Sequence, residues 1–167
     1  MIAEPVTKKI CLIGDFGVGK TSVVARFVDH TFSDKYLSTF GVTIKTKLIE
    51  QDPAIKLVIW DIAGNDIVTA TNSKYLRGAD GFLLVVDGTR PVTALTGMRL
   101  REEVRRECGE IPAVCLMNKS DLTDEWRLGD AHEIALRAGC TSAYRTSAKT
   151  GANVDQSFLD LARAVCG

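Results

Sequence analysis

The sequence has no excess of either charge, no closely spaced cysteine pair and no apolar run long enough to cross a bilayer. Lys plus Arg and Asp plus Glu number 21 each, so no overall field draws the chain to nucleic acid or to an anionic membrane. The five cysteines are an odd number without a C-x-x-C pair, which predicts reduced thiols. The first residues do not resemble a signal segment. Together these absences favour a cytoplasmic protein that binds no nucleic acid.

Two features bear on lipid attachment. Position 2 is Ile rather than the Gly that myristoylation requires, and the last two residues, Cys166-Gly167, do not form a prenylation box. We therefore expect no membrane anchor within this sequence. Whether the natural protein lacks a lipid tail, carries one beyond this sequence or includes this domain in a longer chain stays open.

Apolar runs of strand length alternate with longer amphipathic segments, the pattern of βα units that build a mainly parallel sheet. Strands are expected at residues 10–13, 43–49, 55–60, 81–86 and 113–117, and helices at 20–29, 96–108, 131–138 and 155–165. The connection 51–54 is too short for anything but an antiparallel hairpin. We predict one α/β domain, residues 1–167, whose six-stranded sheet has one antiparallel edge strand and about five flanking helices.

A glycine-rich segment, Gly14-x-x-x-x-Gly19-Lys20-Thr21, follows the first strand and leads into a helix. Its glycines let backbone N–H groups point inward, and the helix N-terminus adds partial positive charge, so the loop suits phosphates. Lys20 would bridge the β- and γ-phosphates, and the Thr21 hydroxyl would ligate Mg²⁺. The segment predicts a P-loop NTPase fold rather than a chance glycine turn. The expected phosphate contacts are Asp15, Phe16, Gly17, Val18, Gly19, Lys20, Thr21 and Ser22.

Asp61 follows the strand 57–60, which would lie beside the phosphate loop in a parallel sheet. A strand-end aspartate is more often a turn or capping residue, but the run Asp61-Ile62-Ala63-Gly64 favours a role in binding Mg²⁺ through water. Gly64 would let its backbone N–H approach a γ-phosphate and report its presence.

Asn118-Lys119-Ser120-Asp121 follows the strand 113–117, at the sheet edge where open α/β sheets bind ligands. A carboxylate at Asp121 would accept both N1–H and N2–H of guanine, whereas the N1 acceptor of adenine would repel it. A polar turn is the alternative for the tetrapeptide alone. An ATPase or small-molecule kinase would need a different base site. The expected base contacts are Asn118, Lys119, Asp121, Ser147, Ala148 and Lys149, with the stem of Lys119 covering the ring.

With these motifs in place, the chain resembles the Ras superfamily of small GTPases from residue 8 to 165, most closely the Rab branch. Residues 36–43 resemble the first switch of Rab proteins, 75–79 the segment after the second switch, and Asn153, Val154 and Phe158 the last helix. The resemblance implies binding of GTP and GDP with Mg²⁺. It also implies an effector, an exchange factor and a GTPase-activating protein at residues 34–46 and 62–76.

The resemblance further implies roles for single residues. Thr39 would bind Mg²⁺ and the γ-phosphate in the GTP state, Phe32 would pack on the guanine, and Tyr36 would join the nucleotide contacts. The family carries a water-orienting Gln where this chain has Asn65, which is one methylene shorter. The position of Phe16 is Gly in Ras and usually Ser in Rab proteins.

Both departures fall at the γ-phosphate end, where the expected catalytic residues are Lys20, Gly64 and Asn65. We therefore predict a molecular switch that hydrolyses GTP slowly without an activating protein. One alternative is that Asn65 still positions water and Phe16 points outward. Another is a GTP-binding scaffold with negligible hydrolysis.

Two further departures concern partners. Residues 66–68 read Asp-Ile-Val where Rab proteins usually carry Glu-Arg-Phe, and Thr43 replaces an Asp. Partner specificity therefore cannot be transferred from the family. Trp60 has two open interpretations, part of an apolar patch for an effector or a core residue at a strand end.

Overall fold

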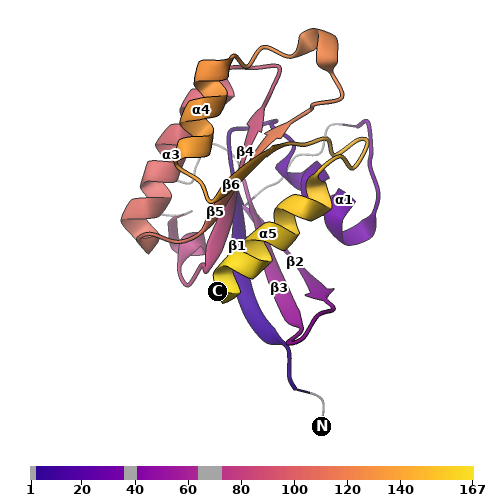
Figure 1. Cartoon of the computed structure of the whole chain (residues 1–167), viewed down its shortest axis with the longest axis vertical. Helices are drawn as coiled ribbons and strands as arrows, with labels where there is room; N and C mark the ends of the chain where they lie inside the picture. The colour runs from indigo at the N-terminus through magenta and orange to yellow at the C-terminus, as the bar shows by residue number, and fades with distance from the viewer. Residues whose placement is uncertain (1–2, 36–40, 64–72) are drawn as a thin grey trace.

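The structure, a computed structural model, describes residues 3–35, 41–63 and 73–167, which form one six-stranded sheet with helices on both faces (Figure 1). The strands are β1 (Val6–Ile13), β2 (Val42–Ile49), β3 (Ile55–Ile62), β4 (Gly81–Asp87), β5 (Ala113–Asn118) and β6 (Ser142–Arg145). The helices are α1 (Lys20–Asp29), α3 (Val92–Cys108), α4 (Asp130–Ala138) and α5 (Val154–Cys166). Two 3₁₀ turns are η1 (Lys74–Leu76) and η2 (Thr123–Glu125).

The sheet has the strand order β2-β3-β1-β4-β5-β6. Only β2 and β3 pair antiparallel; the other four pairs among the described residues are parallel. The expected edge strand is therefore confirmed, because the short 51–54 connection returns the chain beside itself. The expected helix count was about five, whereas the described residues contain four α-helices and two single 3₁₀ turns.

Some element bounds differ from the sequence-based expectation. Helix α3 begins at Val92 rather than at residue 96, with Pro91 at the N-cap, where its fixed φ suits a helix start. Val92 and Leu95 in this first turn are 60% and 62% exposed, so they do not continue the buried stripe that marked the rest of the helix. Strand β6 was not located beforehand because it has four residues and only Ala143 is buried.

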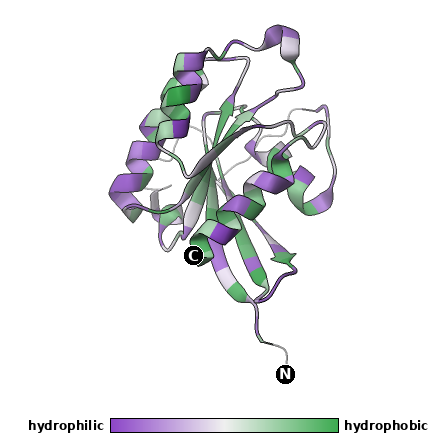
Figure 2. Cartoon of the chain, in the orientation of Figure 1, coloured by the Kyte–Doolittle hydropathy of each residue, from purple (hydrophilic) through white to green (hydrophobic). Residues whose placement is uncertain are grey.

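The sheet separates two apolar clusters. One gathers side chains under α1 and α5, where the rings of Phe27 and Phe158 stack with centroids 4.0 Å apart. The other gathers side chains under α3 and α4. Every residue of β4 and β5 is buried, which gives the continuous hydrophobic centre visible in Figure 2. Parallel strands end at the same edge, so the loops after β1, β4 and β5 meet there.

Candidate nucleotide-binding site

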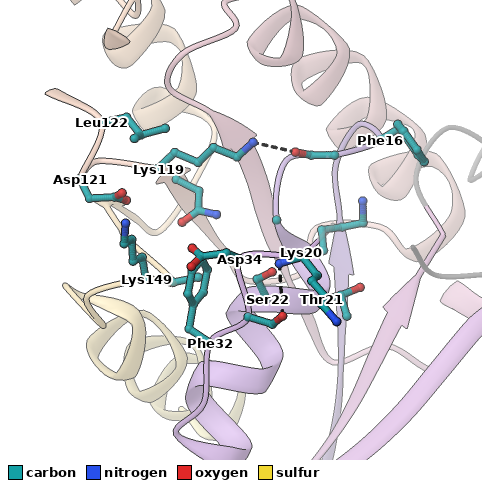
Figure 3. Close-up of a pocket in the computed structure, with 16 residues that line it drawn as sticks. Phe16, Lys20, Thr21, Ser22, Phe32, Asp34, Lys119, Asp121, Leu122 and Lys149 are labelled. Carbon is teal, nitrogen blue, oxygen red and sulfur yellow. Dashed lines mark hydrogen bonds between the residues drawn. The ribbon is translucent and has the colours of Figure 1, made fainter. Parts of the chain in front are cut away.

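A cavity of about 350 Å³ opens at the carboxyl edge of the sheet. In Figure 3, Asp121 and Lys149 lie at one end, and Phe16, Lys20 and Thr21 at the other. Of the expected contacts, it is lined by Phe16, Gly17, Gly19, Lys20, Thr21, Ser22, Phe32, Asn118, Lys119, Asp121, Ala148 and Lys149. Ser33, Asp34, Lys35 and Leu122 also line it, which sequence reasoning missed. Tyr36, Thr39, Gly64 and Asn65 lie outside the described residues.

The phosphate loop presents its main chain to this cavity. Gly17 and Gly19 have φ of 75° and 103°, a left-handed backbone that favours glycine. A Cβ added at Gly19 would lie 2.4 Å from the side-chain nitrogen of Asn118. The side chain of Val18, between these two glycines, is fully buried. The loop thus forms a cradle of the kind that phosphates require, closed by the N-terminus of α1.

Lys20 is the buried cation of this cradle. It is 7% exposed, and its Nζ donates to the carbonyls of Gly14, at 3.0 Å, and Asp15, at 3.1 Å. Burial lowers the pKa of Lys20 to about 8, although Asp61 and Asp15 favour its charged form. A phosphate anion would favour that charged form further.

Thr21 and Asp61 form a pair of oxygen ligands beside the lysine. The Thr21 hydroxyl donates to Asp61 Oδ2 at 2.7 Å, and Asp61 is 2% exposed. Asp61 lies inside β3 and contacts a residue 40 positions away, so it is not a local turn residue. The described residues hold no group of three His, Cys, Asp or Glu suited to a metal. The two oxygens of Thr21 and Asp61 fit Mg²⁺, which takes few protein oxygens and fills its shell with phosphate and water.

The loop after β5 is bonded to the phosphate loop. Asn118 Nδ2 donates to the Val18 carbonyl at 3.0 Å, and Lys119 Nζ donates to the Gly17 carbonyl at 3.0 Å. Asp87 is fully buried at the end of β4 and forms an ion pair with Lys119, whose Nζ lies 2.8 Å from Asp87 Oδ2. Asp87 was missed by sequence reasoning, although an acid ending a wholly apolar strand is a visible signal.

The Ser-Ala-Lys segment, residues 147–149, lies at the end of the cavity where the base is expected. Ser147 Oγ donates to Asp121 Oδ1 at 2.7 Å, which orients one carboxylate oxygen. Arg26 on α1 donates from Nε to the Ala148 carbonyl at 2.7 Å and from its guanidinium to the Lys149 carbonyl. Arg26 was also missed, and nothing in its local sequence distinguishes it from an ordinary helical arginine.

Phe16 lines the cavity and is 51% exposed. Its backbone N–H donates to the Asp15 carboxylate at 2.7 Å, and its carbonyl accepts from Arg90 at 3.1 Å. The main chain of the loop is therefore held in place independently of the ring.

The sequence model of the Ras family matches residues 9–167. The chain belongs to the Ras family. This Ras-family protein is a GTP-binding switch and a GTPase, and it binds GTP and GDP with Mg²⁺. The glycine cradle, the Lys20 amine and the Thr21 and Asp61 oxygens fit those ligands. No helix in the described ranges combines the length and apolar character needed to cross a membrane.

Proposed function

We propose that this Ras-family switch hydrolyses GTP slowly by itself because of Phe16 and Asn65. The observation that carries the proposal is Phe16, a half-exposed aromatic residue among those that line the cavity, which lies at its phosphate end in Figure 3. Attacking water or an activating arginine must approach the γ-phosphate at this end, where a Phe16 ring is bulkier than the Gly or Ser of the resembling proteins. The shorter Asn65 reduces the reach of the amide that would orient water.

Single-turnover GTP hydrolysis tests this proposal. We expect Phe16→Ser combined with Asn65→Gln to speed hydrolysis by about 10-fold or more, a barrier change of about 1.4 kcal/mol. Leu95→Ser is the matched control, since it also replaces an exposed apolar side chain. The proposal fails if the double variant is no faster than the wild type while GTP affinity is retained.

We infer the following roles for the site residues. Lys20 and the backbone of residues 15–22 bind the phosphates, while Thr21 and Asp61 hold Mg²⁺, joined by Thr39 in the GTP state. Bound Mg²⁺ would neutralise charge on the phosphate oxygens. The N–H of Gly64 would contact the γ-phosphate.

At the base end, Asp121 accepts both guanine N–H groups, and the stem of Lys119 covers the ring. Phe32, which is 37% exposed at the cavity edge, packs on the guanine. The Ser147 bond to Asp121 and the Arg26 bonds to residues 148 and 149 support this assignment. Competition of GTP against ATP tests it, and equal affinity would contradict it.

A Rab-like partner surface belongs to the same proposal. Ile44 is 48% exposed and lies opposite Trp60 in the β2–β3 pair, and the Trp60 ring centroid is 6.2 Å from that of Tyr75. Lys9 Nζ lies 3.7 Å from the Trp60 centroid. Trp60 is therefore partly covered and borders an exposed apolar side chain, which supports an effector, exchange-factor and activator surface at 34–46 and 62–76.

Tryptophan fluorescence tests whether this surface responds to the nucleotide. In a Trp126→Phe background, Trp60 is the remaining tryptophan. Replacing GDP with a non-hydrolysable GTP analogue should change its emission, and identical spectra in the two states would count against the surface.

The alternative is a GTP-binding scaffold with negligible hydrolysis, which Phe16 favours. Nucleotide extracted from purified protein separates the two: mostly GDP indicates a cycling enzyme, and mostly GTP a scaffold.

All five cysteines are free thiols, which supports our proposal of a cytoplasmic location.

A further inference from the structure

The backbone carbonyls of residues 14–18, in the phosphate loop, all accept hydrogen bonds from side chains. Four of the bonds come from Lys20 and from the end of β5: Lys20 to Gly14 and Asp15, Asn118 to Val18, and Lys119 to Gly17. The carbonyl of Phe16 accepts instead from Nη2 of Arg90, at 3.1 Å. Arg90 lies in the turn between β4 and α3, so it holds the loop from a separate part of the chain.

The turn between β4 and α3 fixes the backbone of Arg90. Its N–H donates to the Asp87 carbonyl at 3.0 Å, and its carbonyl accepts from the Thr93 hydroxyl at 2.8 Å. The N–H and hydroxyl of Thr89 both donate to Asp87 Oδ1, at 2.8 and 2.6 Å. Because the backbone is already ordered, only the side chain of Arg90 loses freedom when it binds residue 16.

The carboxylate of Asp87 also lies between two cations that bind the loop. Its Oδ2 is 2.8 Å from Lys119 Nζ and 3.9 Å from Arg90 Nε. Asp87 is fully buried, whereas the Arg90 side chain is 43% exposed. Lys119 donates to the Gly17 carbonyl, and Arg90 donates to the carbonyl of the residue before it. One buried carboxylate therefore offsets the repulsion between two cations that bind consecutive carbonyls.

The Arg90 bond sets the direction of the peptide between Phe16 and Gly17. In a trans peptide the C=O and N–H point in opposite directions, so the Gly17 N–H points away from the guanidinium. Gly17 lines the cavity with a φ of 75°, and glycine adopts either sign of φ readily. Rotation of this peptide would exchange its two polar groups. The Phe16 carbonyl oxygen would then repel a phosphate that the N–H attracts.

We propose that Arg90 is a positioning residue that prevents this rotation and keeps the Gly17 N–H directed at the outer phosphates of the nucleotide. The inference rests on the proposed role of residues 15–22 in binding phosphates. Phe16 lies at the end of the cavity opposite Asp121 and Lys149 in Figure 3, which assigns the peptide to the phosphates farthest from the base. Arg90 acts through the Phe16 carbonyl and does not contact the nucleotide itself.

Binding of GDP and GMP to Arg90→Met tests the proposal. Loss of a hydrogen bond from a charged donor should lower GDP affinity about 10-fold and speed GDP dissociation by a similar factor. GMP lacks the outer phosphates, so its affinity in a competition assay should stay unchanged, whereas general loosening of the site would weaken both nucleotides. Arg90→Lys keeps a cationic donor and should recover most of the GDP affinity. Arg99→Met, at an exposed position of α3, is the matched control.

Phosphorus NMR of the GDP complex gives a second readout. In Arg90→Met the resonance of the β-phosphorus should shift, while that of the α-phosphorus keeps its position. The proposal is overturned if Arg90→Met binds GDP as the wild type does, or if GMP affinity falls by the same factor. Gly19→Ala separates two kinds of failure. If it lowers GDP affinity and Arg90→Met does not, the role of Arg90 alone is wrong; if neither does, the loop does not bind the phosphates.

Discussion

The two ends of the cavity, which we propose bind the guanine and the phosphates of the nucleotide, are built from different kinds of contact. At the guanine end, side chains fix one another: Ser147 bonds to Asp121, and Arg26 holds the carbonyls of the neighbouring segment. At the phosphate end, the main chain of the loop forms the site, with Lys20 bonded to backbone carbonyls. Here Phe16 lines the cavity, and its backbone atoms are held by Asp15 and Arg90.

This difference explains which positions can vary. A site made of backbone N–H groups does not depend on which side chain its residues carry. A phenylalanine at position 16 is therefore compatible with phosphate binding. A site made of side chains loses its selectivity with one substitution. We therefore expect substitutions that strain the backbone to weaken nucleotide binding at the phosphate end. At the guanine end, substitutions that remove a polar side-chain group should have this effect.

The largest effect is expected from Gly19→Ala. A Cβ there would lie 2.4 Å from the Asn118 amide at a φ of 103°, so GDP affinity should fall by about 100-fold or more, about 3 kcal/mol. Gly109→Ala is the matched control, with φ 75° and nothing within 4 Å. It should destabilise the fold by about 1 kcal/mol and leave GDP affinity unchanged. Titration with labelled GDP measures the affinity, and thermal unfolding measures the stability. Similar GDP affinities for the two variants would contradict the expected sensitivity of the phosphate end to backbone strain.

Asp121→Asn should produce the next largest effect. Replacing the acceptor pair with an amide removes one charge-assisted bond to guanine, so GDP affinity should fall by about 100-fold, about 3 kcal/mol. Xanthine carries a carbonyl at the position of the guanine amino group, so xanthosine diphosphate should bind the variant better than the wild type. Asp124→Asn in η2 is the control. Unchanged base preference would show that Asp121 does not read the base.

A smaller effect is expected from Arg26→Met, which removes the bonds to the carbonyls of Ala148 and Lys149. GDP should dissociate about 10-fold faster, as the loss of about 1.4 kcal/mol requires. The factor should be equal for GDP and GTP because Arg26 acts at the base end. Arg163→Met, at an exposed position of α5, is the control. A larger factor for GTP would place the effect at the phosphate end instead.

The smallest effect is a pH dependence carried by Lys20. Its pKa of about 8 in the protein without nucleotide rises when phosphate binds. Below pH 8 both states keep the proton, whereas above pH 8 binding must take one up, so GDP affinity falls as pH rises from 8 to 9. Calorimetry in two buffers of different ionisation enthalpy at pH 8.5 should show uptake of about three quarters of a proton. Equal heats in the two buffers would contradict this.

The sequence predicted the sheet and the cavity well because both depend on local patterns. Continuous apolar runs identified β4 and β5, and the glycine spacing identified the loop that surrounds Lys20. It could not reveal Arg26 or the pair of Asp87 with Lys119, because these contacts join segments far apart in the chain. Helix α3 was predicted to begin too late because its first turn exposes Val92 and Leu95. The roles of the individual site residues, Asn65 and Thr39 among them, remain predictions.

The bonds from Asn118 and Lys119 to the phosphate loop have a consequence for the lifetime of the bound nucleotide. The loop that we propose reads the base also supports the loop that we propose holds the phosphates, because Asn118 and Lys119 donate to the Val18 and Gly17 carbonyls. Loosening either loop removes support from the other. We therefore expect base and phosphates to be released together in one cooperative step, so that a partner protein displacing one of the two loops would free the whole nucleotide.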